Sequence, residues 1–77
     1  MKRPTAAQLR AFNEVAATGS FSRAARSLGL SQPAITAQIK ALEEGFAVRL
    51  FDRTASGSEL TALGHRLFQR TAEQRDV

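Results

Sequence analysis

The sequence of 77 residues predicts a mainly α-helical winged helix-turn-helix, with a three-helix core, a two-stranded wing and a C-terminal helix. Two observations support this fold class. Between residues 21 and 42, two short helical patterns are separated only by a glycine-containing turn, which is typical of a helix-turn-helix. Between residues 48 and 61, two short strand-like runs flank a turn of small residues, which predicts a hairpin, and a hairpin in this position is a wing.

The first helix is expected from residue 6 to about Thr18, before Gly19. Thr5 and Gln8 have the spacing of a capping box, with Thr5 as the N-cap. Ser20 is the expected N-cap of the next helix. Apolar residues recur along one side of the first helix, so we expect it to brace the helix pair and complete the core.

The helix pair is defined by its turn and by one apolar stripe. Gly29 stands where the first helix must end and where the backbone needs a positive φ. Ser31 is a suitable N-cap for the second helix. Ile35, Ile39 and Leu42 recur at the helical spacing, which predicts that this face of the second helix is buried.

The opposite face of the second helix is slender and polar. It comprises Gln32, Pro33, Thr36, Ala37 and Lys40. Glutamine can bond adenine with two hydrogen bonds, threonine can contact a thymine methyl group, and lysine reaches guanine or phosphate. A helix N-terminus also attracts phosphate. An ordinary solvated helix face is the alternative, but the helix-turn-helix context and the basic chain favour a DNA-binding face.

The hairpin and the last helix follow this pair. A first strand is expected over residues 48–53, a turn over 54–58 and a second strand over 59–61. A helix is then expected from residue 61 or 62 to about Gln74, with an apolar face that we expect to pack against a second copy of the chain. Its predicted dimerisation residues are Leu63, Leu67 and Phe68.

Composition limits the possible functions. Eleven Lys and Arg against seven Asp and Glu give a net charge of +4, which suits a polyanionic partner. There is no cysteine, and the only histidine, His65, has no neighbours at ligand spacing, so neither a metal nor another cofactor is expected. No apolar run approaches the roughly 20 residues of a membrane span, and the cytoplasm is the expected compartment. The chain contains no catalytic motif, so we do not expect an enzyme.

The residues resemble a known family. The chain from Leu9 to Leu67 is similar to the N-terminal DNA-binding domain of LysR-type transcriptional regulators, which are bacterial. The similarity is strongest at Ala24-Ala25, Ser31-Gln32-Pro33-Ala34, Gln38-Ile39, Leu42-Glu43, Leu50-Phe51-Asp52-Arg53 and Leu60-Thr61 with Gly64.

The resemblance implies a function and a division of the chain. Residues 1–60 would form a winged helix-turn-helix that binds double-stranded DNA, and residues 61–77 would begin a linker helix that forms a homodimer. An effector-binding domain for a small molecule would be absent from this chain. The resemblance places Ser31, Gln32, Pro33, Thr36 and Ala37 at the major groove, Ser22 and Arg23 near the phosphates, and Arg53 at the wing. Ala34 and Lys40 complete the residues expected at DNA.

The sequence departs from the family pattern at five places, among them Arg49, where proline is common, and Leu63, where alanine is. Ser56 stands where the family often has a second basic wing residue, which puts minor-groove insertion by the wing in doubt. Ala37 replaces a larger residue and removes one possible base contact. Gly45-Phe46-Ala47 replaces the usual leucine-glycine pair. The second helix of the pair, which is the recognition helix, is therefore expected to end two residues earlier than in the family.

Two other binding functions remain open from the sequence. A winged-helix scaffold with an apolar last helix can serve as a protein-interaction module, because fold alone does not determine function. RNA binding is a third possibility, but no aromatic RNA-binding motif is present. Binding to duplex DNA in the presence of competitor would separate these alternatives.

Overall fold

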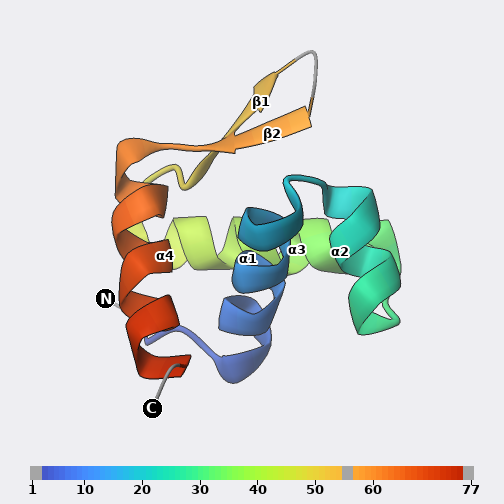
Figure 1. The fold of residues 1–77 in the computed structure, drawn as a ribbon, viewed down its shortest axis with the longest axis horizontal. Helices are drawn as coiled ribbons and strands as arrows, with labels where there is room; N and C mark the ends of the chain where they lie inside the picture. The colour runs from blue at the N-terminus through green and yellow to red at the C-terminus, as the bar shows by residue number, and fades with distance from the viewer. Residues whose placement is uncertain (1–2, 55–56, 76–77) are drawn as a thin grey trace.

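The computed structural model describes residues 3–54 and 57–75, and it has the predicted winged helix-turn-helix architecture (Figure 1). Helices α1, α2 and α3 surround the core, strands β1 and β2 form the wing, and α4 lies beside α1. The elements are α1 (Ala6–Thr18), α2 (Phe21–Leu28), α3 (Gln32–Phe46), β1 (Phe51–Thr54), β2 (Gly57–Leu60) and α4 (Ala62–Arg75).

The predicted helix signals of α1 are confirmed. The Thr5 hydroxyl accepts a hydrogen bond from the Gln8 N–H, and the Thr5 N–H donates to the Gln8 side-chain oxygen, each at 3.1 Å. These reciprocal bonds satisfy two N–H groups that the first turn would otherwise leave without a partner. The helix ends at Gly19, whose φ is 71° and whose N–H donates to the carbonyl of Val15.

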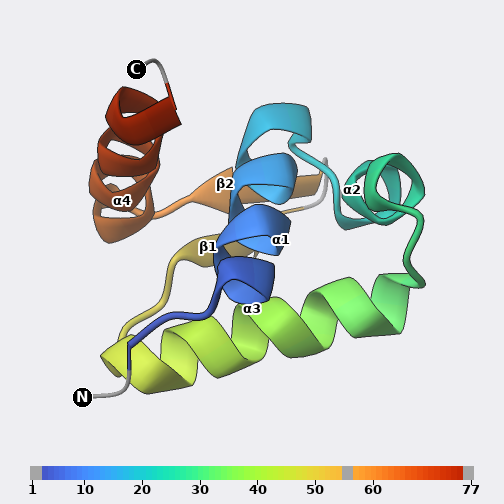
Figure 2. The ribbon, with the colours of Figure 1, turned by 90° about the horizontal axis from the view of Figure 1, so that it is seen from below.

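The turn between α2 and α3 also follows the prediction. The Ser20 hydroxyl caps α2 by accepting the Arg23 N–H, and the Ser31 hydroxyl caps α3 by accepting the Ala34 N–H. Between them, Gly29 has a φ of 68°, a left-handed conformation that costs glycine little. Figure 2 shows the result: α3 runs along one side of the molecule, with α1 and α2 packed on its inner face.

The core is built from the apolar stripes of the three helices and from the chain that enters the wing. The rings of Phe12 and Phe51 have centroids 5.4 Å apart, and those of Phe21 and Phe51 are 5.8 Å apart. Such tilted aromatic pairs stabilise a core beyond the burial of their surface. The buried residues are Ala11, Phe12, Val15, Phe21, Ala24, Ala25, Ile35, Ile39, Leu42, Leu50 and Phe51.

The end of α3 differs from the prediction. The helix does not end early at Gly45 but continues to Phe46, which packs against the core. Ala47 then adopts the left-handed conformation with a φ of 56°, the only described residue other than glycine with a positive φ. The N–H groups of Ala47 and Val48 bond back to the carbonyls of Glu44 and Glu43, and they close the helix end.

The hairpin is shifted from its predicted position. The strands pair antiparallel from Phe51 opposite Leu60 to Thr54 opposite Gly57. The prediction that residues 48–50 begin the first strand was wrong, as was the assignment of Thr61 to the second. Of the predicted turn, residues 55 and 56 lie outside the described residues, and the structure places the others in the strands.

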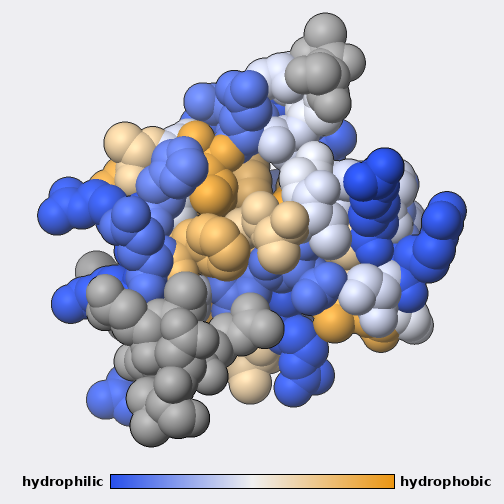
Figure 3. All heavy atoms as spheres, in the orientation of Figure 1, coloured by the Kyte–Doolittle hydropathy of each residue, from blue (hydrophilic) through white to orange (hydrophobic). Residues whose placement is uncertain are grey.

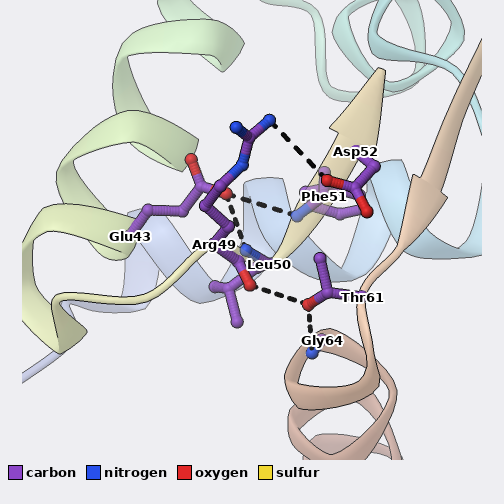
Figure 4. Close-up of polar contacts among 7 residues, drawn as sticks. All are labelled: Glu43, Arg49, Leu50, Phe51, Asp52, Thr61 and Gly64. Carbon is purple, nitrogen blue, oxygen red and sulfur yellow. Dashed lines mark hydrogen bonds and ion pairs between the residues drawn. The ribbon is translucent and has the colours of Figure 1, made fainter. Parts of the chain in front are cut away.

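Polar contacts explain this shift (Figure 4). The Leu50 and Phe51 N–H groups donate to the Glu43 carboxylate at 2.7 and 3.2 Å, so the chain before β1 is bound to α3. The Thr61 hydroxyl accepts the Gly64 N–H at 3.0 Å and therefore starts α4. Adjacent elements thus occupy the hydrogen-bonding groups that a longer strand would need.

Helix α4 approaches the wing and α1 closely. A Cβ atom on Gly64 would lie 2.2 Å from the Leu50 carbonyl oxygen, so only glycine fits there. Further along, Phe68 packs edge-on against Phe12 at 6.4 Å, and the Thr71 hydroxyl donates to the Asn13 side-chain oxygen at 2.7 Å. Across the described residues, no helix combines the length and apolar character of a membrane span.

Candidate DNA-binding surface

The outer face of α3 is exposed along the predicted residues. Gln32, Pro33, Ala37 and Lys40 are exposed and Thr36 is half-buried, whereas the opposite face lies in the core. This arrangement confirms the predicted division of the helix into a buried and an outward face. A shallow hollow of about 580 Å³ follows its first two turns; its lining residues are Gln32, Pro33, Thr36 and Ala37.

A polar cleft of about 530 Å³ lies beside the start of α3. The turn after α1 and the start of α2 form one wall, and the wing forms the other, because the wing extends toward the α2 end of the molecule (Figure 1). The cleft brings together the predicted residues Ser22, Arg23, Gln32 and Arg53, which come from three elements. Its two arginines make it suitable for a phosphate group.

The first polar contact in this cleft joins α2 to α3. The Ser22 hydroxyl donates to the side-chain oxygen Oε1 of Gln32 at 3.0 Å. Gln32 is the first residue of α3, and its side chain is exposed. The side chain predicted to contact a base is therefore hydrogen-bonded within the protein.

The second contact places Arg53 of the wing. Its guanidinium carbon lies 4.6 Å from the centroid of the Phe21 ring, a cation–π arrangement. Asp52 and Glu59 are the acidic residues of the wing that could form an ion pair with Arg53. In the described part of the chain, the ion pair at Asp52 is made by Arg49, at 3.7 Å and with both side chains exposed.

The remaining predicted residues surround these contacts. Arg23 and Lys40 are exposed, Ala34 is half-buried, and the Ser31 hydroxyl is occupied as the N-cap of α3. Lys40 and Arg53 border a smaller hollow of about 210 Å³ between α3 and the wing. The prediction about minor-groove insertion by the wing depended on Ser56. This residue lies outside the described residues.

Comparison with known proteins identifies the family. A sequence model described as bacterial regulatory helix-turn-helix protein, lysR family, matches residues 6–65, which is most of the chain. The chain belongs to the LysR family.

Individual LysR-family regulators agree with this assignment. The chain is 43% identical over 76 residues to the HTH-type transcriptional regulator CbbR of Xanthobacter flavus. It is 48% identical over 67 residues to TfdT of Cupriavidus pinatubonensis. These matches take in 90% and 87% of this chain but only 23% and 29% of the two regulators. The chain thus spans about a quarter of the length of these curated relatives.

Solved structures confirm the fold. The DNA-binding domain of CbnR in complex with DNA matches with a TM-score of 0.83 and 40% identity, over 91% of this chain and 80% of that one. The DNA-binding domain of BenM with catB site 1 DNA matches with a TM-score of 0.86 and 31% identity, over 91% and 79%. Oxidised OxyR of Corynebacterium glutamicum matches with a TM-score of 0.90 and 36% identity, over 97% and 24%. The chain corresponds to the DNA-binding domain of a LysR-type transcriptional regulator.

Sequence reasoning missed several residues of this LysR-type surface. Thr18, Thr54 and Ser58 line the cleft, and Arg49 borders the smaller hollow. Arg49 was assigned only to a strand, although its place between two apolar residues in a basic stretch was a usable signal. The three hydroxyl residues carried no such signal, because their position depends on how the wing packs over α2.

The predicted dimerisation residues differ in how exposed they are in the structure. Leu63 is 46% exposed, whereas Leu67 and Phe68 are half-buried and pack against the core of their own chain. Figure 3 shows apolar residues exposed between α4 and α1, with hydrophilic residues around them. A hollow of about 350 Å³ lies there; its lining includes Val15, Ala16, Phe51 and Leu60, together with Ser58, Glu59 and His65.

Proposed function

We propose that this chain binds double-stranded DNA sequence-specifically, with α3 in the major groove of a dyad-symmetric operator. One observation carries the proposal: the outward face of α3 is slender and polar, and buried Ile35, Ile39 and Leu42 hold it outward between the start of α2 and the wing. A single α-helix fits the major groove, and base edges are best distinguished there. The DNA complexes of the related CbnR and BenM domains support the same use of this fold.

The proposed contacts divide into base and phosphate contacts. Gln32 and Thr36 would contact base edges, because amide and hydroxyl groups match their donors and acceptors. Pro33 and Ala37, with little bulk, would allow α3 to approach the bases closely. Ser31 and Ala34 lie at the N-terminus of α3, the end of the helix whose dipole attracts phosphate, with the Ala34 N–H already donated to the Ser31 hydroxyl. The expected phosphate contacts are Arg23, Lys40 and Arg53.

The full regulator would act as a homodimer. The apolar patch between α4 and α1, together with exposed Leu63, offers a surface that a second copy could cover. Two-fold symmetry would then match a roughly palindromic site. Since the chain spans about a quarter of the curated relatives, a small-molecule effector would bind elsewhere in the full-length protein.

Selection from a random duplex pool tests this function. At about 0.15 M salt with competitor DNA, the chain should enrich one half-site sequence, repeated at about one helical turn or a multiple of it. Failure to enrich any sequence, with the chain folded, would contradict the proposal. That result would favour the alternative, a protein-interaction module, which the DNA complexes of related domains do not support.

Gln32→Ala should relax recognition at one base pair. Loss of a two-bond contact to a base costs about 1–3 kcal/mol of discrimination. We expect the variant to fold normally but to discriminate less between the selected duplex and a scrambled one, as measured by competition titration. Gln69→Ala removes the same side chain from an exposed position of α4 and is the control. Equal losses on both duplexes would count against a base contact by Gln32.

A further inference from the structure

The hydrogen bond between Ser22 and Gln32 assigns a role to the serine. We propose that Ser22 is a positioning residue, which holds the amide of Gln32 in the orientation that contacts a base. The inference rests on the proposed function, because it concerns how the same surface distinguishes sequences. It goes beyond that function in replacing the expected phosphate contact of Ser22 with a role in specificity.

The bond links two helices through their side chains. Ser22 lies in the first turn of α2 and Gln32 is the first residue of α3, ten positions later. Both side chains are exposed, so neither is fixed by burial. Glutamine is among the side chains that lose most rotamer freedom when they are ordered. A bond of 3.0 Å to a neighbouring helix reduces that freedom before DNA arrives.

The direction of the bond determines which hydrogen-bond donors and acceptors Gln32 can present to a base. Its Oε1 accepts the Ser22 hydroxyl, so one lone pair of Oε1 is occupied, and among the described residues Nε2 has no acceptor. The second lone pair of Oε1 and one N–H still match the N6–H and N7 of adenine. In this orientation Oε1 lies toward Ser22, and Nε2 keeps its donors for a base.

The surroundings place this pair at the edge of a duplex. Arg23 and Arg53 line the same cleft as Ser22 and Gln32, and Arg53 is stacked over Phe21. A phosphate bound by these arginines would bring Gln32 next to the groove, with Ser22 behind it. Ser22 then acts on the bases through Gln32 rather than by its own contact.

The experiment uses the duplex that the wild-type chain selects from a random pool. Its companions are the three duplexes with the other base pairs at the position that Gln32→Ala relaxes. The protein variants are Ser22→Ala, Ser22→Thr, Ser22→Val, Gln32→Ala and the double variant Ser22→Ala with Gln32→Ala. Thermal unfolding followed by circular dichroism verifies that each variant folds, and Ser27→Ala, another exposed serine of α2, is the matched control.

Ser22→Ala should lower discrimination at that single position about 3- to 10-fold, the range expected for the loss of one neutral hydrogen bond. Affinity for scrambled duplex should not change. Ser22→Thr keeps the hydroxyl and should discriminate like the wild-type chain. Ser22→Val has the shape of threonine without the hydroxyl and should discriminate like Ser22→Ala. In the Gln32→Ala background, Ser22→Ala should have no further effect.

Four results would overturn the inference. An equal loss of affinity on all duplexes would make Ser22 a phosphate contact. Independent effects of the two substitutions in the double variant would exclude action through Gln32. If Gln32→Ala relaxes a position and Ser22→Ala does not, this inference alone fails. If the wild-type chain selects no sequence, the proposed function fails and the inference fails with it.

Discussion

Arg53 illustrates how packing orders a single surface residue at the proposed DNA-binding face. Its guanidinium lies over the ring of Phe21, a residue whose side chain is 7% exposed. The ring therefore fixes one face of the guanidinium, while its N–H groups remain along the edges. Because the stack restricts this long side chain in advance, less freedom would be lost in the proposed contact with a phosphate.

Arg53→Ala should flatten the dependence of DNA affinity on salt. One phosphate contact fewer releases about one counterion fewer, so the slope of log K against log salt should fall by about one unit. The measurement is a series of binding titrations between about 0.05 and 0.2 M salt. Arg53→Lys keeps the charge and should keep the slope. An unchanged slope in Arg53→Ala would mean that the side chain contacts no phosphate.

At the scale of elements, the end of α3 determines where the wing begins. The Glu43 carboxylate accepts hydrogen bonds from the N–H groups of Leu50 and Phe51. Both of these residues are almost fully buried. Ala47 turns the chain back in a left-handed conformation that normally favours glycine. One side chain and one unusual backbone conformation thus connect the recognition helix to the hairpin.

Glu43→Ala should destabilise the fold by about 1–3 kcal/mol, because it leaves two buried N–H groups without an acceptor. The measurement is urea unfolding followed by circular dichroism. Glu44→Ala is the matched control: its side chain is exposed, and its removal should change stability little. Equal effects of the two substitutions would show that the carboxylate of Glu43 does not hold the wing.

Ala47→Gly should stabilise the chain by about 1 kcal/mol, since glycine adopts the left-handed conformation without the steric cost that alanine meets. The urea midpoint should rise with an unchanged m-value. Ala41→Gly, at an exposed position inside α3, should do the opposite and lower stability by about 1 kcal/mol. Destabilisation by both changes would argue against a left-handed Ala47.

For the whole molecule, α4 is the element through which the proposed dimer would form. Phe68 and Thr71 dock it on α1 through an aromatic contact and a hydrogen bond to Asn13. Its position relative to α3 is therefore set by the core, while Leu63 remains exposed. Two copies joined through this side of the molecule would hold their recognition helices at a defined spacing.

Leu63→Lys should reduce cooperative binding to a duplex with two half-sites and leave binding to one half-site unchanged. A charge placed at an exposed apolar position weakens contact with a second copy without disturbing the fold. Sedimentation of the complex gives the number of chains per duplex. Leu30→Lys adds the same charge at the other exposed large apolar residue of the described chain, 48% exposed, and is the control. Undiminished cooperativity in Leu63→Lys alone would place the dimer contact elsewhere.

The sequence by itself determined the features whose partners are close in the chain. The capping box of Thr5 and Gln8, the Ser31 cap, the Gly29 turn and the buried stripe of α3 each follow from spacings of three to seven residues. Helical geometry makes such spacings sufficient, because it fixes which neighbours lie on one face. The outward face of α3, and with it most of the candidate site, could therefore be predicted.

Only the tertiary structure decided how separate elements meet. The Glu43 carboxylate displaces the start of β1, Arg53 stacks on Phe21, and Ser22 bonds Gln32. The stack joins residues 32 positions apart, and the other two contacts join residues seven to ten positions apart but on different elements. No spacing rule specifies these pairs, because they depend on how the helices and the wing pack around the core.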